Sequence, residues 1–352
     1  MVPILGAALS VANGAMSLFT CRFMKVRNTI EKRSVLGQLS DMDLRLLKVF
    51  KSVVECGGMA AAELELNIGT STISRHVKDL ETRLALVLCR RGRAGFALTA
   101  DGQQVYEQTL RLLASVDEFR SGIDDIHHRL GGRLDIALFD KTITNPQARV
   151  SEAVALFAQA APGVDLHLHV ASINASERGV LDGHFHIGVI PSHRTSRTLA
   201  YADLFGETML LYCGMRHPLF AAPDTGLTWA KLRLHAFAGL GYHSPNMELS
   251  HRAGLLRRAT GYDQEAIVTL ILSGGFLGFL PDHYASGFEA RGQLRAISPR
   301  RFHYACRFVS LLRQSPHPSR TTQLFADCLV AAHAGVAPIT ATTDDRVAAV
   351  GV

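Results

Sequence analysis

Residues 69–84, GTSTISRHVKDLETRL, decide the fold of the N-terminal part of the chain. Apolar residues recur there at steps of four, three and four, which predicts a helix with one apolar stripe: Ile73, Val77, Leu80 and Leu84. Arg75, His76 and Lys78 gather near the start of this helix, although the helix dipole disfavours cations at that end. The arrangement indicates that the start of the helix faces something strongly negative.

The distribution of charge agrees with this reading. The formal net charge of the 352-residue chain is +6, and all of the excess lies in residues 1–100, because residues 101–352 carry equal numbers of acidic and basic side chains. A polyanion or an anionic surface is therefore expected to meet the N-terminal part, and the remainder is expected to have a different role. The length allows two or three domains, and a hydrophobic content of 47% allows a large core.

Two shorter helices are expected before this one, the first from Asp43 and the second within residues 59–66. Residues 69–71 then form a tight turn, with Thr70 or Ser71 as the expected helix cap. Such a layout is typical of a helix-turn-helix, in which the third helix enters the major groove of DNA. The expected DNA contacts are Thr70, Ser71, Thr72, Ser74, Arg75, His76 and Lys78. A solvated helix face would explain this helix equally well if it stood alone.

A hairpin is expected directly after the third helix. Two β-prone segments, Val87–Cys89 and Phe96–Leu98, flank a glycine-rich turn that holds three arginines: Arg90, Arg91 and Arg93. A hairpin with a cationic tip beside a helix-turn-helix is a wing, and a wing can lie along the phosphate backbone or the minor groove. A plain surface hairpin is the alternative, and it gives the three arginines no role.

A long helix is expected from Asp101 to Leu130, capped by Thr99, with a length of roughly 45 Å. Apolar residues alternate along it at steps of three and four, as in a coiled coil. The expected dimerisation residues are Val105, Leu112, Val116, Phe119, Ile123 and Ile126. Packing against the chain's own domain is the alternative. A dimer would place two winged modules on two half-sites.

Three segments carry a resemblance to a known family: MDLRLLKVFKSVVECGG, AAELELNIGTSTISRHVKDLETRL and LCRRGRAGFALTADG. Together they closely resemble the DNA-binding domain of LysR-type transcriptional regulators, including the Leu-Thr-x-x-Gly that opens the long helix. The chain departs from the family pattern at Gly69-Thr70, where Ser-Gln is usual, and at Cys89, where Phe is usual. The first departure touches an expected DNA contact, so the family's operator preference is not transferred to this chain.

Strands and helices alternate through residues 132–335, which predicts an α/β region with a largely parallel sheet. Helices are expected near residues 249–258 and 266–273, among others. The resemblance implies an effector domain similar to periplasmic solute-binding proteins (type 2), with two lobes that grip a small ligand. The expected fold is thus α/β, with an all-α-rich winged helix-turn-helix N-terminal domain and a long linker helix. The expected boundaries are an extension (1–41), the DNA-binding domain (42–100), the linker (101–131), the effector domain (132–335; subdomain I 132–205 and 307–335, subdomain II 206–306) and a tail (336–352).

Polar residues that follow strands and precede helices are expected to line the cleft between the two lobes, because such positions bring convergent polar groups to a ligand. These candidates for effector binding are Thr142, Thr144, Asn145, Ser172, Asn174, His243 and Ser244. Exposed amides at helix starts favour an anionic effector. Each side chain would alternatively serve only to cap its own helix.

Other patterns point to no further chemistry. The six cysteines are scattered without a CxxC pair, so a zinc site is not expected and a reducing cytosol is favoured. The His-x-His pairs at 167/169 and 184/186 are expected to be outward-facing surface residues rather than metal ligands. No cofactor motif, catalytic triad or membrane span is recognised. Residues 1–41 read as an extension rather than a signal peptide, with Met24 and Met42 as alternative starts.

These observations predict a cytoplasmic, one-component transcriptional regulator. It would bind promoter DNA as a homodimer or homotetramer, respond to a small-molecule effector, and contact RNA polymerase. Two alternatives stay open at this point. One is a DNA-binding protein that needs no effector, and the other is an enzyme on the α/β region, although no complete catalytic set is present.

Overall fold

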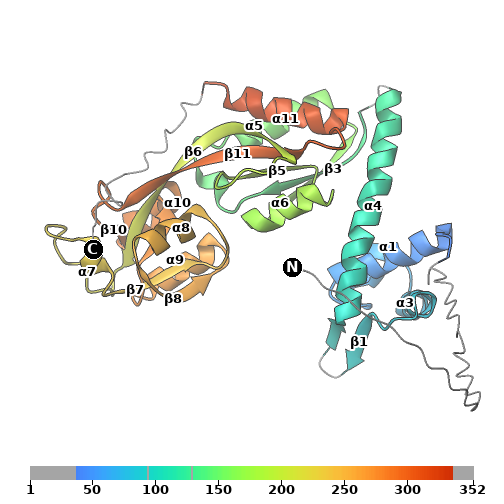
Figure 1. Ribbon diagram of the computed structural model, residues 1–352, viewed down its shortest axis with the longest axis horizontal. Helices are drawn as coiled ribbons and strands as arrows, with labels where there is room; N and C mark the ends of the chain where they lie inside the picture. The colour runs from blue at the N-terminus through green and yellow to red at the C-terminus, as the bar shows by residue number, and fades with distance from the viewer. Residues whose placement is uncertain (1–36, 93–94, 128–129, 336–352) are drawn as a thin grey trace, which may run out of the picture.

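The computed structural model describes residues 37–92, 95–127 and 130–335. Three parts follow one another along the chain: a small helical domain, a long helix and an α/β region (Figure 1). Residues 1–36 of the expected extension, Arg93 at the expected wing tip and the expected tail 336–352 lie outside the described residues.

The N-terminal domain packs three helices and a hairpin around one apolar core. Its elements are α1 (Asp41–Glu55), α2 (Ala62–Leu66), α3 (Thr70–Leu84), β1 (Cys89–Gly92) and β2 (Gly95–Leu98). A capping box opens α1, since the Ser40 hydroxyl accepts the Asp43 N–H and the Asp43 carboxylate accepts the Ser40 N–H. Fully buried side chains from α1, α3 and the segment before β1 form the core: Phe50, Val53, Ile73, Leu80 and Leu88. The predicted winged helix-turn-helix is confirmed.

The long helix α4 (Ala100–Ile126) begins directly after the hairpin. Thr99 caps it as predicted, because its Oγ1 accepts the Gly102 N–H at 2.8 Å and donates to the Val87 carbonyl at 2.6 Å. The helix ends four residues before the expected Leu130. Ion pairs then join α4 to the α/β region, Arg111 with Asp182 and Glu118 with Arg313.

The α/β region has two lobes, and the first is built from both ends of its sequence (Figure 1). Its sheet begins with three parallel strands: β3 (Gly132–Leu138), β4 (Val164–Val170) and β5 (Ile187–Pro191). A short 3-10 helix follows β3 at Thr142–Thr144. The helices of this lobe are α5 (Val150–Ala160), α6 (Ile173–Leu181) and α11 (Arg320–His333). Phe157 of α5 packs edge-on against Phe325 of α11, with ring centroids 5.3 Å apart.

Two long antiparallel strands run from the first lobe into the second: β6 (Leu199–Gly214) and β11 (His303–Arg313). The second lobe contains α7 (Trp229–Leu232), β7 (Ala236–Leu240), α8 (Pro245–Arg252), β8 (Leu256–Gly261), α9 (Gln264–Leu272), β9 (Gly278–Pro281), α10 (Asp282–Ala290) and β10 (Leu294–Ala296). The main sheet has the order β10-β6-β11-β5-β3-β4, with β9 beside β6, and β7 pairs with β8 in parallel.

Two expectations about this region are wrong in detail. The sheet is mixed rather than largely parallel, because β6 and β11 carry the chain between the lobes in opposite directions. The helix expected at residues 249–258 ends at Arg252, and β8 starts at Leu256. Gly254 lies between them with a φ of +65°, a left-handed conformation that ends helices and suits glycine.

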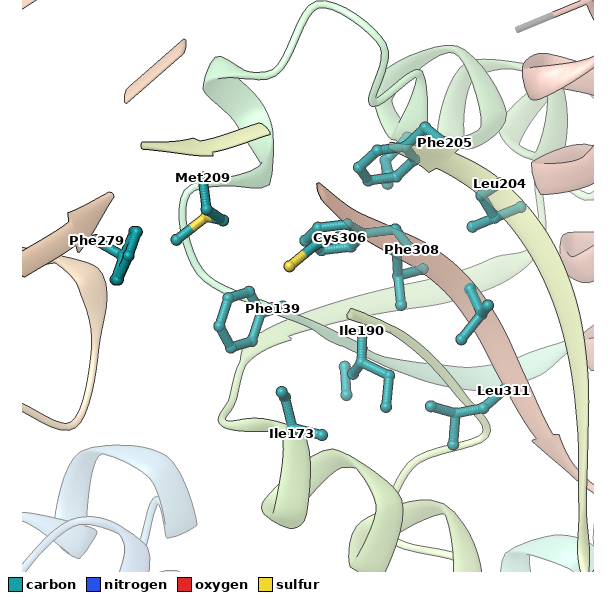
Figure 2. Close-up of a cluster of buried hydrophobic side chains, with 14 of the residues drawn as sticks. Phe139, Ile173, Ile190, Leu204, Phe205, Met209, Phe279, Cys306, Phe308 and Leu311 are labelled. Atoms are coloured by element: carbon teal, nitrogen blue, oxygen red, sulfur yellow. The ribbon is translucent and has the colours of Figure 1, made fainter. Parts of the chain in front are cut away.

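The core of the first lobe continues along β6 and β11 toward the second lobe (Figure 2). Phe205 of β6 stacks on Phe308 of β11, with ring centroids 4.6 Å apart. Further along, the side chains of Met209, Cys306 and Phe139 converge from β6, β11 and the segment after β3 (Figure 2). The same apolar cluster continues into the second lobe, where it includes Phe237 and Phe279.

Candidate nucleic-acid interface and interlobe cavity

The start of α3 presents an exposed cationic face on the side opposite its buried stripe. Arg75 and Lys78 are exposed, and neither forms an ion pair with any described residue. Ser71 is also exposed, and Thr72 and Ser74 are half-buried at the same end of the helix. Because the opposite stripe has no exposed surface, the helix has one orientation on the domain and these side chains face outward.

Two of the predicted contacts on α3 have roles inside the protein. The hydroxyl and the N–H of Thr70 both donate to the Glu63 carboxylate of α2, and these bonds hold the pKa of Glu63 below its usual range. Gly69 is the N-cap and has no side chain, so Glu63 performs the capping that was expected of Thr70 or Ser71. Both ring nitrogens of His76 are buried and make no hydrogen bond with described residues. Thr70 and His76 are thus engaged with the protein itself, and their predicted contact with DNA stays a prediction.

The hairpin after α3 packs against the domain core, and its strand β1 has an exposed arginine. Glu81 of α3 accepts the Leu88 N–H at 2.8 Å, which fixes the start of β1. Cys89 is 7% exposed and packs with the half-buried Phe96 against the core, so the small thiol occupies a core position. Arg90 is exposed on β1. Predictions for the side chain of Arg91 and for Arg93 fall outside the described part of the chain.

The apolar seam of α4 divides into two halves. Val105 and Leu112 pack against the core formed by α1, α3 and Leu88 of the same chain, and Thr109 between them is 2% exposed. Val105 and Leu112 are therefore partly covered by their own domain, and their predicted dimer contact stays a prediction. Beyond the half-buried Val116, the seam is exposed, and the exposed fractions are 70% at Phe119, 41% at Ile123 and 71% at Ile126.

A small, partly open cavity of about 20 Å³ lies between the two lobes. Phe139 and Ile173 of the first lobe line one side, and Met209 of β6 and Leu240 of the second lobe line the other. Its polar wall residues are Glu207, Ser244, Asn246, Gln264, Tyr304 and Cys306. The volume corresponds to roughly one water molecule.

The cavity wall contains one buried carboxylate, that of Glu207, which is 4% exposed. Its Oε2 lies 3.1 Å from Nε2 of His283, and Nδ1 of His283 lies 2.8 Å from the Thr144 hydroxyl. Burial raises the pKa of Glu207, against a smaller opposing effect of His283. Burial also raises the pKa of the Tyr304 hydroxyl and of the Cys306 thiol, so both are neutral at pH 7. The neutral thiol is a poor nucleophile.

The histidine pairs behave differently from the prediction that all would face outward. His167 is exposed, but His169 and His186 both contact Asp135: His169 Nε2 lies 2.9 Å from the carboxylate, and His186 Nδ1 accepts the Asp135 N–H at 2.9 Å. The ring of His184 packs on Phe185. Among the described residues, no group of three or more His, Cys, Asp or Glu side chains is arranged to hold a metal ion. In the same part of the chain, every helix is too short or too polar to cross a membrane.

Two family models match the chain. The model described as "Bacterial regulatory helix-turn-helix protein, lysR family" matches residues 44–103, and the "LysR substrate binding domain" matches residues 127–334. The chain belongs to the LysR family of transcriptional regulators. It combines the family's helix-turn-helix DNA-binding domain with its effector domain, and the family consists of regulators rather than enzymes.

Relatives and solved structures agree with this LysR assignment. The HTH-type transcriptional activator BauR of Pseudomonas aeruginosa is 39% identical over 294 residues, which cover 84% of this chain and 96% of that protein. The probable HTH-type transcriptional regulator LrrA of Synechococcus elongatus is 30% identical over 57% of this chain and 66% of its own length. The crystal structure of CbnR, a LysR family transcriptional regulator, has a similar fold with a TM-score of 0.54 at 19% identity, over 82% of this chain and 99% of that chain.

Within this LysR effector domain, Ser244 alone of the seven predicted effector residues lines the interlobe cavity. Thr142 and Asn145 are buried, and the Asn145 amide donates to the Gly206 carbonyl at 2.9 Å. Ser172 caps α6. Asn174 accepts a hydrogen bond from Arg194. Thr144 hydrogen-bonds with His283, which in turn contacts Glu207 of the cavity wall.

His243 also lies off the cavity wall, beside His193 and 3.4 Å from Glu248. The polar cavity residues that the sequence analysis missed are Glu207, Asn246, Gln264, Tyr304 and Cys306. Glu207 and Cys306 lie inside strands β6 and β11, where no helix start marks them. Asn246 and Gln264 do lie at helix starts, next to Ser244 and Asp263, so the rule that found Ser244 would have found them if extended by one or two residues.

Proposed function

We propose that this LysR-family regulator binds promoter DNA sequence-specifically through α3, with the wing lying on the neighbouring phosphates. The observation that carries this proposal is the exposed pair Arg75 and Lys78 in the first nine residues of α3, which lacks a counter-ion among the described residues. Arg75 can read guanine through two hydrogen bonds, whereas Ser71, Thr72, Ser74 and Lys78 suit phosphates or base edges.

The exposed half of the α4 seam supports assembly as a homodimer or homotetramer. Phe119 and Ile126 expose large apolar side chains on one long helix, and such exposure is usual where a partner helix packs. Two copies would place two α3 helices on two half-sites of a promoter. We further propose that the protein works in the cytoplasm and contacts RNA polymerase there. Its similarity to a protein described as a transcriptional activator favours activation.

We propose that a small-molecule effector binds between the lobes and alters the arrangement of the half-sites. Support comes from the cavity, whose walls come from both lobes and so would change shape when the lobes move. The sequence-based expectation of an anionic effector stays a prediction. A regulator that needs no effector is a second candidate, and the small volume of the cavity favours it.

Footprinting on genomic fragments, with and without candidate metabolites, tests the proposed function. We expect protected promoter sites in two half-sites, and an altered footprint or bend with the correct effector. Full-length protein that shows no preference for promoter fragments over random duplex at low ionic strength would contradict the DNA-binding proposal. A footprint that no cavity ligand changes would instead favour the effector-independent candidate.

A further inference from the structure

The walls of the interlobe cavity contain one carboxylate and no basic side chain among the described residues. Of its twelve wall residues, six are apolar and five are neutral polar residues, and Glu207 is the only charged one. Neither lysine nor arginine lines the cavity within the described part of the chain. A ligand with a carboxylate or phosphate would bring a second negative charge into this cavity beside Glu207, without a cation on the cavity wall to balance it. Such a pair of buried like charges is strongly unfavourable.

Glu207 itself has an incomplete set of partners. Buried carboxylates are normally matched by a lysine, an arginine or a metal ion. Among the described residues, the only side chain that pairs with Glu207 is His283. One oxygen of the carboxylate, Oε2, contacts His283. Glu207 is also one of the residues that line the cavity. The carboxylate is therefore able to accept a hydrogen bond from a donor inside the cavity.

Neutral acceptors accompany the carboxylate. Gln264 is 2% exposed, and its Oε1 atom makes no hydrogen bond, while its backbone N–H is fixed on Asp140 at 2.7 Å. Asn246 is also 2% exposed. Its amide lies beside Tyr304, although neither of its polar atoms makes a hydrogen bond of ordinary geometry. Buried acceptors without donors are costly, and a ligand that supplies N–H groups would satisfy them.

We propose that the effector is a compact molecule with a primary ammonium group, which binds in this cavity with its –NH₃⁺ on Glu207. An ammonium group has three donors and no acceptor, which matches the carboxylate, the Gln264 carbonyl and the Asn246 carbonyl. Phe139, Ile173, Met209 and Leu240 would pack against a short carbon skeleton. The ligand must be compact, and the lobes must part further to admit it, because the cavity offers only about 20 Å³. This inference rests on the proposal that an effector binds between the lobes.

Calorimetric titration and thermal melting of the full chain without DNA test this inference. The probes are n-butylammonium, 4-aminobutyrate, butyramide and butyrate, which share one carbon skeleton and differ in charge. We expect n-butylammonium to bind and to raise the melting temperature, whereas butyramide and butyrate do neither. 4-Aminobutyrate should bind more weakly than n-butylammonium, because its carboxylate adds a second negative charge near Glu207. Glu207→Gln keeps the size of the side chain and removes its charge, and it should weaken ammonium binding by about thirtyfold or more. Glu248→Gln changes an acidic residue of the same lobe outside the cavity and should leave binding unchanged.

Several results would overturn the inference. Binding of butyrate in preference to n-butylammonium would reverse it and support the anionic expectation. Failure of both ammonium compounds to bind, or equal binding by wild-type and Glu207→Gln protein, would also reject it. If Glu207→Gln does not fold, the comparison among the four probes with wild-type protein still decides the question. None of these measurements involves DNA. If the ammonium compounds fail to bind, the proposal that the protein binds promoters is unaffected, and if no footprint is found, the titrations still test ligand binding.

Discussion

Replacing Gly102 with alanine should disrupt the junction between the wing and α4. A Cβ atom at this position would lie 1.9 Å from the Leu88 carbonyl oxygen and 2.8 Å from its carbonyl carbon. Atoms in proteins do not approach so closely, and the obstacle is backbone rather than a flexible side chain. The same carbonyl accepts the N–H of Thr99, the residue that caps α4, at 3.0 Å, so a shift of this carbonyl would also disturb Thr99.

Overpacking of this kind costs typically 1–3 kcal/mol, and we expect the upper end, about 3 kcal/mol, because backbone must shift. For a domain of this size the melting temperature should fall by roughly 12–24 °C. Gly122→Ala is the matched control, since Gly122 lies in the same helix with no atom within 4 Å of the added methyl group. That change should stabilise α4 by about 0.5–1 kcal/mol.

Calorimetric melting of the three full-length proteins measures the effect on the transition of the N-terminal domain. The reasoning would be refuted if Gly102→Ala melted at or above the temperature of wild type while Gly122→Ala behaved as expected. A large loss for both variants would show instead that α4 tolerates no added methyl group, and the Leu88 contact would then lose its special role. DNA affinity should fall with Gly102→Ala, because Leu88 lies between α3 and the wing and a shift there would displace the wing from α3.

Three further predictions follow from the DNA-binding domain and the linker. Arg75→Glu should abolish specific promoter binding in mobility-shift assays. Arg90→Ala should weaken binding to all DNA sequences and lower the slope of log affinity against log salt concentration by about 1. If both changes affected specific and random DNA equally, these roles would be contradicted. The Ser40 and Arg83 hydrogen bonds lower the pKa of Asp43 to about 2 from 3.8, so its contribution to stability is present above pH 3.8 and is lost as the pH falls through 2. Acid titration should therefore show a steeper loss of stability in wild type than in Asp43→Asn, and parallel curves would argue against the pairing. The double change Phe119→Asp and Ile126→Asp should shift the oligomer toward monomer in sedimentation velocity. It should not lower the melting temperature of the N-terminal domain. An unchanged oligomer would place the interface elsewhere.

Much of the N-terminal domain could be predicted from the sequence, because its elements are short and their signals are local. The spacing of Ile73, Val77 and Leu80 fixes which face of α3 is buried, and therefore which face carries Arg75. Thr99 and the glycine three residues later are close enough in sequence for capping to be recognised. Local spacing does not reveal which polar residues at a helix start are buried in the protein or form hydrogen bonds within it.

Thr70 and His76 show this limit, since their surroundings come from other elements. Thr70 bonds to Glu63, seven residues earlier, because the turn at Asn67 brings α2 back onto the start of α3. Val105 and Leu112 continue the same periodic seam as Phe119 and Ile126. The period is identical in both halves, and only the position of α1 decides that the first half is buried within the chain.

The sequence by itself determined the family, the helix-turn-helix with its wing, and the outward cations of α3, since each depends on residues within a few turns of one another. Only the tertiary structure decided the interlobe cavity. Glu207 and His283 are 76 residues apart, and Asp140 and Gln264 are 124 apart. They meet because β6 and β11 cross between the lobes and set the second lobe against the first. Burial of a charge or an amide depends on such distant contacts, which periodicity along the chain does not encode.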